Sequence, residues 1–165
     1  MESFEFGSTF WITVGAVFIL LILSGFFSGM EIAFISSNKI YLEIEKQQTG
    51  ITSRLLNLIT KNPSRFIATM LVGNNVSLVI YGIFMGDRIL QLFFPETLLS
   101  GVIGIEIVFI QTIISTVVIL LTAEFLPKVF FQQYANVFIK VFALPTGVFF
   151  TMFTPITLMV IKLSD

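Results

Sequence analysis

The sequence predicts an all-α integral membrane protein. Of its 165 residues, 56% are hydrophobic and 20 are phenylalanine, and the mean hydropathy is +0.98. A helix needs about 20 mostly apolar residues to cross roughly 30 Å of hydrocarbon, and several runs of the sequence approach that length. Basic residues gather in one connection between these runs. Together these observations predict membrane-spanning helices joined by short polar segments.

Three apolar runs are long enough to form spanning helices. No Lys or Arg precedes the first run, which continues well past the length of a signal core without an A-x-A cleavage pattern. We therefore interpret it as a spanning helix and not as a cleaved signal. The stretches GDR at 86–88 and FPE at 94–96 predict the turn between the second and third runs. The predicted spans are residues 10–36, 64–86 and 98–122.

The connection between the first two spans carries most of the basic residues. None precedes the first span, and only Arg88 lies between the second and third. Because basic residues favour the cytoplasmic side, the 37–65 connection is predicted to be cytoplasmic. The N-terminus is then predicted to lie on the outer side of the membrane. The predicted location is the cell membrane, either a plasma membrane or an inner membrane. The basic residues of the connection are Lys39, Lys46, Arg54, Lys61 and Arg65.

The same connection is predicted to form an amphipathic helical hairpin over residues 38–62. Asn38 offers an N-cap, apolar residues recur at helical spacing, and Asn62-Pro63 ends the pattern. Thr49 and Gly50 predict a break between two short helices. Helices of this kind lie on the inner leaflet.

A fourth apolar segment, residues 134–162, is also predicted to be helical. Pro145 and Pro155 would each break its hydrogen-bond ladder. From the residues alone, this segment could span the bilayer, kink, or lie along the interface.

Composition excludes several function classes. The chain has no histidine and no cysteine, which leaves no imidazole or thiolate metal ligand and no Ser-His or cysteine nucleophile. Net charge is −1, and no basic patch interleaved with aromatics indicates nucleic-acid binding. A hydrolase built on a serine and Lys128 is set aside, because Lys128 lies far in sequence from the motif serines. The protein is predicted not to be an enzyme.

The first polar cluster lies inside the first span. Ser24, Ser28 and Glu31 are spaced i, i+4 and i+7, so their oxygens share one helix face. Gly25 and Gly29 form a neighbouring G-x-x-x-G face, which favours close helix packing. The serines could instead bond the carbonyls four residues earlier in their own helix, and Glu31 could reach interfacial water.

The second cluster lies in the second span, where Gly73, Asn74, Asn75 and Ser77 interrupt apolar sequence. An amide at that depth must find polar partners, because lipid offers none. Either the two amides bond a neighbouring helix or they form part of a ligand site. The glycine beside them favours the ligand site.

The third cluster is Glu124 with Pro127 and Lys128, after the third apolar run. Pro127 disfavours helix at Leu126 and is predicted to free backbone carbonyls nearby. A carboxylate beside free carbonyls is suited to a cation. Lys128 could instead neutralise Glu124 at i+4, in an ordinary ion pair.

Together the clusters offer hydroxyl, amide, carboxylate and carbonyl oxygens, without nitrogen or sulfur ligands. This set suits Mg²⁺ or Ca²⁺ and not zinc, iron or copper. Only one or two of the donors are charged, and weak charge compensation favours passage of an ion over its storage.

Three motifs carry a family resemblance: "SGFFSGMEIAFIS", "LVGNN" and "AEFLPK", in this order. With these, nearly the whole chain resembles the transmembrane domain of the CorC and CNNM (cyclin M) magnesium-transport proteins. The resemblance implies a homodimer with three spanning helices per subunit, a cytoplasmic hairpin, and a belt-like, interfacial fourth segment at 134–162. Full members continue into a cytosolic pair of CBS modules, so residues 1–165 are expected to be a truncated chain that holds the transmembrane domain alone.

The resemblance also implies a Mg²⁺ exporter that works by alternating access, with Na⁺ as the coupling ion. The exporter binds a dehydrated ion in an inward-facing cavity. A dimeric Mg²⁺-sensing membrane anchor is the alternative. The family usually has glycine at Ala123 and often a further asparagine at Leu78, which puts the coordination number in doubt. Glu31 is a candidate for a second ion or for the cavity mouth. The implied Mg²⁺ ligands are Ser24, Ser28, Asn74, Asn75, Glu124 and the carbonyl of Ala123.

Overall fold

The computed structural model describes residues 7–94 and 104–164, and within these ranges every element is helical. Part of the predicted 98–122 span, residues 98–103, and two residues of the predicted FPE turn lie outside the described residues. The elements are α1 (Ser8–Ser36), α2 (Lys39–Gln47), α3 (Ile51–Lys61), α4 (Pro63–Phe93), α6 (Ile105–Ile119), the π-helix η1 (Leu120–Phe125), α7 (Leu126–Gln133), α8 (Ala135–Val141) and α9 (Ala143–Ser164).

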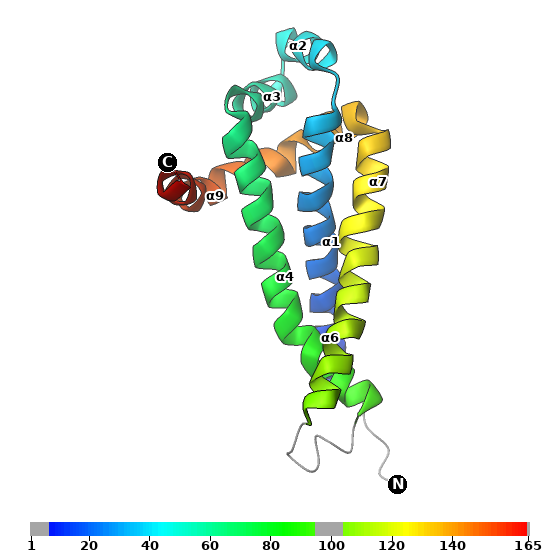
Figure 1. Cartoon of the computed structure of the whole chain (residues 1–165). Coiled ribbons are helices and arrows are strands. Elements are labelled where there is room, and N and C mark those ends of the chain that lie inside the picture. The colour runs from blue at the N-terminus through cyan, green and yellow to red at the C-terminus, as the bar shows by residue number, and fades with distance from the viewer. Residues whose placement is uncertain (1–6, 95–103, 165) are drawn as a thin grey trace.

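Three long rods form the body of the protein. α1, α4 and the continuous rod made of α6, η1 and α7 run side by side, and α2, α3 and α8 gather at one end (Figure 1). α1 contacts both of the other rods. The core lies towards the α2–α3 end, where Met30, Phe66 and Met70 from the rods are fully buried with Leu56 and Ile59 from α3.

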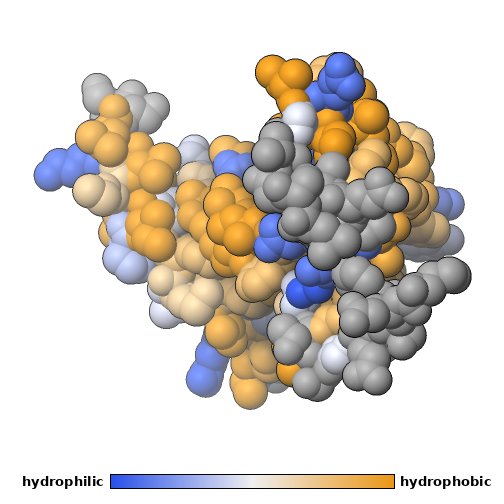
Figure 2. Space-filling model, turned by 90° about the horizontal axis from the view of Figure 1, so that it is seen from below, coloured by the Kyte–Doolittle hydropathy of each residue, from blue (hydrophilic) through white to orange (hydrophobic). Residues whose placement is uncertain are grey.

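The surface of these rods suits a bilayer. By length and composition, four helices within the described ranges could cross a membrane: α1, α4, the α6–α7 rod and α9. Seen from below, towards the end of the rods, the molecule shows apolar residues over much of its coloured surface, with hydrophilic residues between them (Figure 2). No residue of α6 is fully buried, and apart from its contact with α4 most of its surface faces outward from the single chain.

α4 is longer than the predicted span. The prediction that residues 86–88 form a turn is wrong, because the helix continues through them to Phe93. A glycine inside a helix costs only about 1 kcal/mol, and Gly86 leaves room for α6: a Cβ here would lie 2.6 Å from Nε2 of Gln111. The Arg88 side chain bonds to Thr13 of α1 and so links the two helices.

The third rod also continues beyond its predicted end at residue 122. The prediction that Pro127 disfavours helix at Leu126 is wrong, because Leu126 has φ −60° and ψ −50°. The backbone instead widens into the π-helix η1, in which the Leu126 N–H bonds to the carbonyl of Leu121. A π-helix accommodates the proline without a break because it shifts the hydrogen-bond register by one residue.

Two short helices occupy the connection over 38–62. Asn38 caps α2, since its Oδ1 accepts hydrogen bonds from the backbone N–H groups of Ile40 and Tyr41. The break falls at 48–50, where Gly50 has φ +147°, a conformation that side-chain-bearing residues rarely adopt. Ile40 and Ile51 stay exposed on this pair of helices.

α8 and α9 lead away from the rods. α9 runs across them instead of along them, and packs against α3 and α4 (Figure 1). The prediction that Pro145 breaks a helix is wrong, because Pro145 lies in the first turn of α9. A backbone N–H in the first turn has no partner within the helix, so proline, which lacks one, is tolerated there. The break falls just before it, at Phe142. Pro155 lies inside α9.

Glycines set the spacing between α1 and its neighbours. A Cβ on Gly25 would lie 2.9 Å from Cγ of Pro127, and one on Gly29 would lie 2.6 Å from Cγ of Phe131. On α4, a Cβ on Gly73 would meet the ring of Phe27 at 2.7 Å. The prediction that Gly25 and Gly29 allow close helix packing is confirmed.

Replacing Gly29 should therefore destabilise the protein. In Gly29→Leu the added side chain overlaps the Phe131 ring, and overpacking of this kind costs about 1–3 kcal/mol. The melting temperature of the detergent-solubilised chain measures the loss. Gly15→Leu is the matched control, because nothing lies within 4 Å of a Cβ at Gly15. Equal melting temperatures for the two variants would contradict the close packing of α1 on α7.

An ion pair fastens α2 to α8. Lys140 Nζ donates to Oε1 of Glu45 at 2.8 Å, and the Glu45 side chain is only 8% exposed. The hydrogen bond from Lys140, with a further one from Tyr41, lowers the pKa of Glu45, although burial opposes the shift. The same bond to Glu45 raises the pKa of Lys140.

This pair should make stability depend on pH at acid values. A carboxyl with a lowered pKa stabilises the fold above its unfolded value, 4.5, and that stability is lost as pH falls through the folded value. Melting curves between pH 7 and pH 3 should therefore fall more steeply for the parent than for Glu45→Gln. Glu43→Gln is the control, because Glu43 pairs with Lys46 inside its own helix. A parent and Glu45→Gln with parallel pH profiles would contradict a stabilising pair.

Candidate metal site

Ser24 and Asn74 meet between α1 and α4. Ser24 is fully buried, and its Oγ donates a hydrogen bond to Oδ1 of Asn74 at 2.5 Å. The Ser24 hydroxyl could have donated to the carbonyl of Leu20, four residues earlier in its own helix. It donates to α4 instead. The structure therefore brings together two of the predicted ligands from different helices.

Ser28 is one turn further along α1. It is 1% exposed, and its Oγ has no hydrogen-bond partner in the part of the chain that the structure describes. The alternative that this serine bonds its own helix is therefore wrong. Ser77, by contrast, does bond the carbonyl of Gly73 at 2.9 Å. A buried hydroxyl without a partner is costly, so Ser28 is a donor or acceptor that a ligand could satisfy.

Ala123 lies against α1 on the η1 side. It is fully buried, and its carbonyl oxygen lies 3.8 Å from where a Cβ on Gly25 would be. Pro127 has no backbone N–H, so it cannot supply the α-helical bond to this carbonyl four residues earlier. The carbonyl that the family resemblance implies as a ligand thus lies beside α1, next to the position where Gly25 has no side chain.

Glu124 is next along η1 but has different surroundings. It is half-buried and lines a shallow pocket of about 420 Å³ formed by its own rod, with Leu120, Phe125 and Lys128 among the other walls. Among the described residues, Glu124 and Lys128 form no ion pair within 4.0 Å. The alternative of an ordinary i, i+4 pair is therefore wrong, and the carboxylate is left for another cation.

The remaining two predicted residues stand apart. Asn75 is exposed on α4, and Glu31 is half-buried on α1. Neither makes a hydrogen bond or ion pair with Ser24, Asn74 or Glu124 in the described ranges. The single chain therefore assembles part of the predicted donor set and leaves Asn75 and Glu124 open towards its surroundings.

The donor set determines which ions could bind. Within the described residues, no group of three or more His, Cys, Asp or Glu could hold a metal ion. Any cation here would depend on neutral oxygens: the Ser24 and Ser28 hydroxyls, the Asn74 amide and the Ala123 carbonyl. Hard oxygen donors with a single nearby carboxylate suit Mg²⁺ or Ca²⁺.

One polar anchor inside the bundle escaped the sequence analysis. Arg88 donates through Nη2 to Oγ1 of Thr13 at 2.7 Å, and its guanidinium lies 5.3 Å from the centre of the Phe10 ring. The signal was present, because Arg88 is the one basic residue between the second and third spans. The sequence analysis used Arg88 only to predict topology and did not predict that it links α1 and α4.

A comparison with protein families identifies the family of the chain. The model of the cyclin M (CNNM) transmembrane N-terminal domain matches residues 15–165, which is nearly the whole chain and includes all three polar clusters. A search among curated proteins found no match. With its long apolar helices, the protein is a multi-pass membrane protein. The chain belongs to the cyclin M (CNNM) transmembrane-domain family, which points to a role in Mg²⁺ transport or in its regulation.

Proposed function

We propose that this protein moves Mg²⁺ outward across the cell membrane by alternating access, with Na⁺ as the coupling ion. The observation that carries the proposal is the buried Ser24–Asn74 contact between α1 and α4, with the unpartnered hydroxyl of Ser28 one turn away. Oxygens oriented away from their own helices inside an apolar bundle support a site for a hard cation.

Mg²⁺ parts with its water reluctantly and requires near-octahedral oxygen coordination. The proposed ligands are Ser24, Ser28, Asn74, Asn75, Glu124 and the Ala123 carbonyl. In the described structure only some of these are in contact, so binding would draw η1 and α4 together around the ion. A π-helix suits such a movement, since its register can shift by one residue, and π-helical turns are frequent at functional sites.

A second copy of the chain would complete the surface. Asn75 is exposed on a helix long enough to span the membrane, and an amide facing lipid lacks partners. α6 has no fully buried residue, although most of its residues are apolar. Both observations support the homodimer that the family resemblance implies.

The positions of α2, α3 and α9 support the proposed orientation. α2 and α3 carry most of the basic residues of the connection, which favours the cytoplasmic side. α9 crosses the rods near the same end (Figure 1), which supports a belt along the inner face. We propose that the N-terminus is outside and that a cytosolic CBS pair follows in the full-length protein.

A Mg²⁺-sensing membrane anchor is the second candidate. The Glu45–Lys140 ion pair ties α2 to α8, so a change in the rods would be transmitted to the hairpin on the cytoplasmic side. Such a connection would serve a sensor as well as a transporter, and the two are separated only by measuring transport.

Glu124→Gln should weaken Mg²⁺ binding without unfolding the protein, because it removes the charge and keeps the shape of a half-exposed side chain. At Mg²⁺ about 100 times the parent's dissociation constant, the parent should gain about 2.7 kcal/mol, and a tenfold weaker variant about 1.4 kcal/mol. Melting temperatures with and without Mg²⁺ measure this. Glu106→Gln is the matched control, an exposed carboxylate at the start of the same rod. If Glu124→Gln and Ser24→Ala both respond like the parent, the proposed site is wrong.

Transport should depend on the same carboxylate. Proteoliposomes loaded with Mg²⁺ and given an inward Na⁺ gradient should lose Mg²⁺ when they hold the parent or Glu106→Gln, and should retain it with Glu124→Gln. A fluorescent Mg²⁺ indicator follows the loss. The full-length protein is assayed beside this chain, because its cytosolic modules could be needed for coupling. Binding that depends on Glu124, without efflux from either protein, would favour the sensor.

A further inference from the structure

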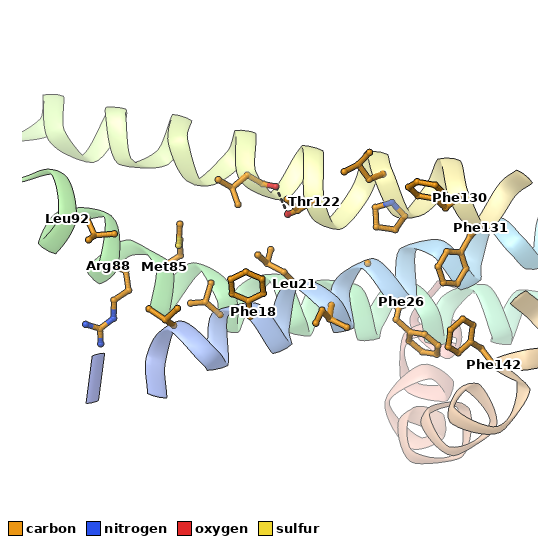
Figure 3. Close-up of a pocket in the computed structure, with 17 residues that line it drawn as sticks. Phe18, Leu21, Phe26, Met85, Arg88, Leu92, Thr122, Phe130, Phe131 and Phe142 are labelled. Atoms are coloured by element: carbon orange, nitrogen blue, oxygen red, sulfur yellow. Dashed lines mark hydrogen bonds between the residues drawn. The ribbon is translucent and has the colours of Figure 1, made fainter. Parts of the chain in front are cut away.

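A long apolar groove runs between α1 and the α6–α7 rod, alongside the contact between them. Its volume is about 750 Å³, within the range of small-ligand pockets. Phe18 and Leu21 of α1 form one wall, and Val118, Leu126 and Phe130 of the rod form the other (Figure 3). Almost every lining residue is apolar. A groove of this composition between helices of a membrane protein can be filled by hydrocarbon.

The groove is elongated along the helices. Its α1 wall extends from Val14 to Phe26, which is about 18 Å at 1.5 Å per residue. One leaflet contributes roughly 15 Å of the hydrocarbon core, so the groove matches the length of one acyl chain. A helix of that length, taken as a cylinder 10 Å wide, would fill about 1,400 Å³. A helix from a second chain could therefore enter the groove only with part of its width, whereas an acyl chain is narrow enough to lie inside it.

The two ends of the groove differ. At the α8 end three aromatic rings close it: Phe142 packs against Phe26 and Phe131, with ring centres 5.7 Å apart in each pair. At the other end lies Arg88, beside Leu92 and Met85 (Figure 3). The apolar interior thus ends at a cation.

The hydrogen-bond partners of the Arg88 side chain within the described residues are neutral. Its terminal nitrogens donate to Oγ1 of Thr13 and to Oε1 of Gln91, and its Nε is buried without a partner. Within the described residues no carboxylate pairs with it. A guanidinium binds phosphate well, because several N–H groups can donate to one oxyanion.

We propose that the groove binds one acyl chain of a phospholipid whose phosphate contacts Arg88. The apolar walls accept the chain, the three rings limit its depth, and the guanidinium fixes the headgroup at the opposite end. The site is independent of the proposed transport. Gly25 and Thr122 line the groove and adjoin Ser24 and Ala123 in sequence, so a bound chain would also contact the backbone beside the candidate metal site.

The test uses this chain in phosphatidylcholine nanodiscs that contain a phosphatidylglycerol probe with a photoactivatable diazirine at the end of one acyl chain. Mass spectrometry should find the label concentrated on groove residues of α1 and α7. Leu21→Trp and Val118→Trp fill the groove from its two walls and should each lower the labelling about tenfold. Ile83→Trp is the matched control, because Ile83 is 65% exposed on α4 and does not line the groove.

A second comparison tests the headgroup contact. Arg88→Gln should lower labelling by the phospholipid probe about tenfold, as expected for the loss of a charge-assisted bond. A diacylglycerol probe with the same chain should label weakly and be insensitive to Arg88→Gln. Equal labelling by the two probes, in the parent and in Arg88→Gln, would overturn the phosphate contact.

Two other outcomes would overturn the groove itself. One is label spread evenly over all exposed helices and unchanged in both tryptophan variants, as for ordinary boundary lipid. The other is a tryptophan variant that alters the mass of the oligomer while lipid labelling persists, because the groove would then hold a second chain. Each variant is first checked for folding by its melting temperature.

Discussion

Close approach of α1 to its neighbours is the constraint on which the rest of the structure depends. In lipid, apolar side chains gain nothing by leaving their solvent, so helices associate through tight packing and polar contacts. Gly25 and Gly29 let η1 and α7 reach α1, and Gly73 lets α4 close around Phe27. The Gly73 contact brings α4 close to α1, and on these two helices the Ser24 hydroxyl donates to Asn74. The glycines therefore position the polar groups while having no chemistry of their own.

Much of the fold could be predicted because the physics of spanning helices acts locally. Hydrophobic length, the caps at Asn38 and the break at Gly50 are properties of short stretches. The errors came from the same local rules. A glycine and two charges at 86–88 indicated a turn, yet α4 stays helical there, with Gly86 against Gln111 and Arg88 bonded to Thr13. Pro127 indicated a broken helix, but a π-helix absorbs the missing bond.

The candidate site was only partly predictable for a related reason. Spacing placed Ser24 and Ser28 on one face, but whether a serine bonds its own helix or a neighbour depends on which helix lies opposite. Asn74 and Asn75 are adjacent in sequence, yet one bonds Ser24 and the other is exposed. The family match covers all these positions but does not orient their side chains. Packing decides this, and packing involves residues far apart in sequence.

In the proposed transport cycle an ion is both bound and released, and the incomplete contact between the donors suits both steps. A cage of six preformed oxygens would hold Mg²⁺ too firmly to pass it on, since conduction requires binding that is strong enough for entry and weak enough for exit. Here the neutral donors of α1 and α4 are already buried, whereas the single carboxylate, Glu124, lies outside them on a π-helical turn. A shift of η1 by one residue would change the direction in which Glu124 points. In the proposed cycle the Glu124 carboxylate would then contact the ion last and leave it first, which is the order that alternating access needs.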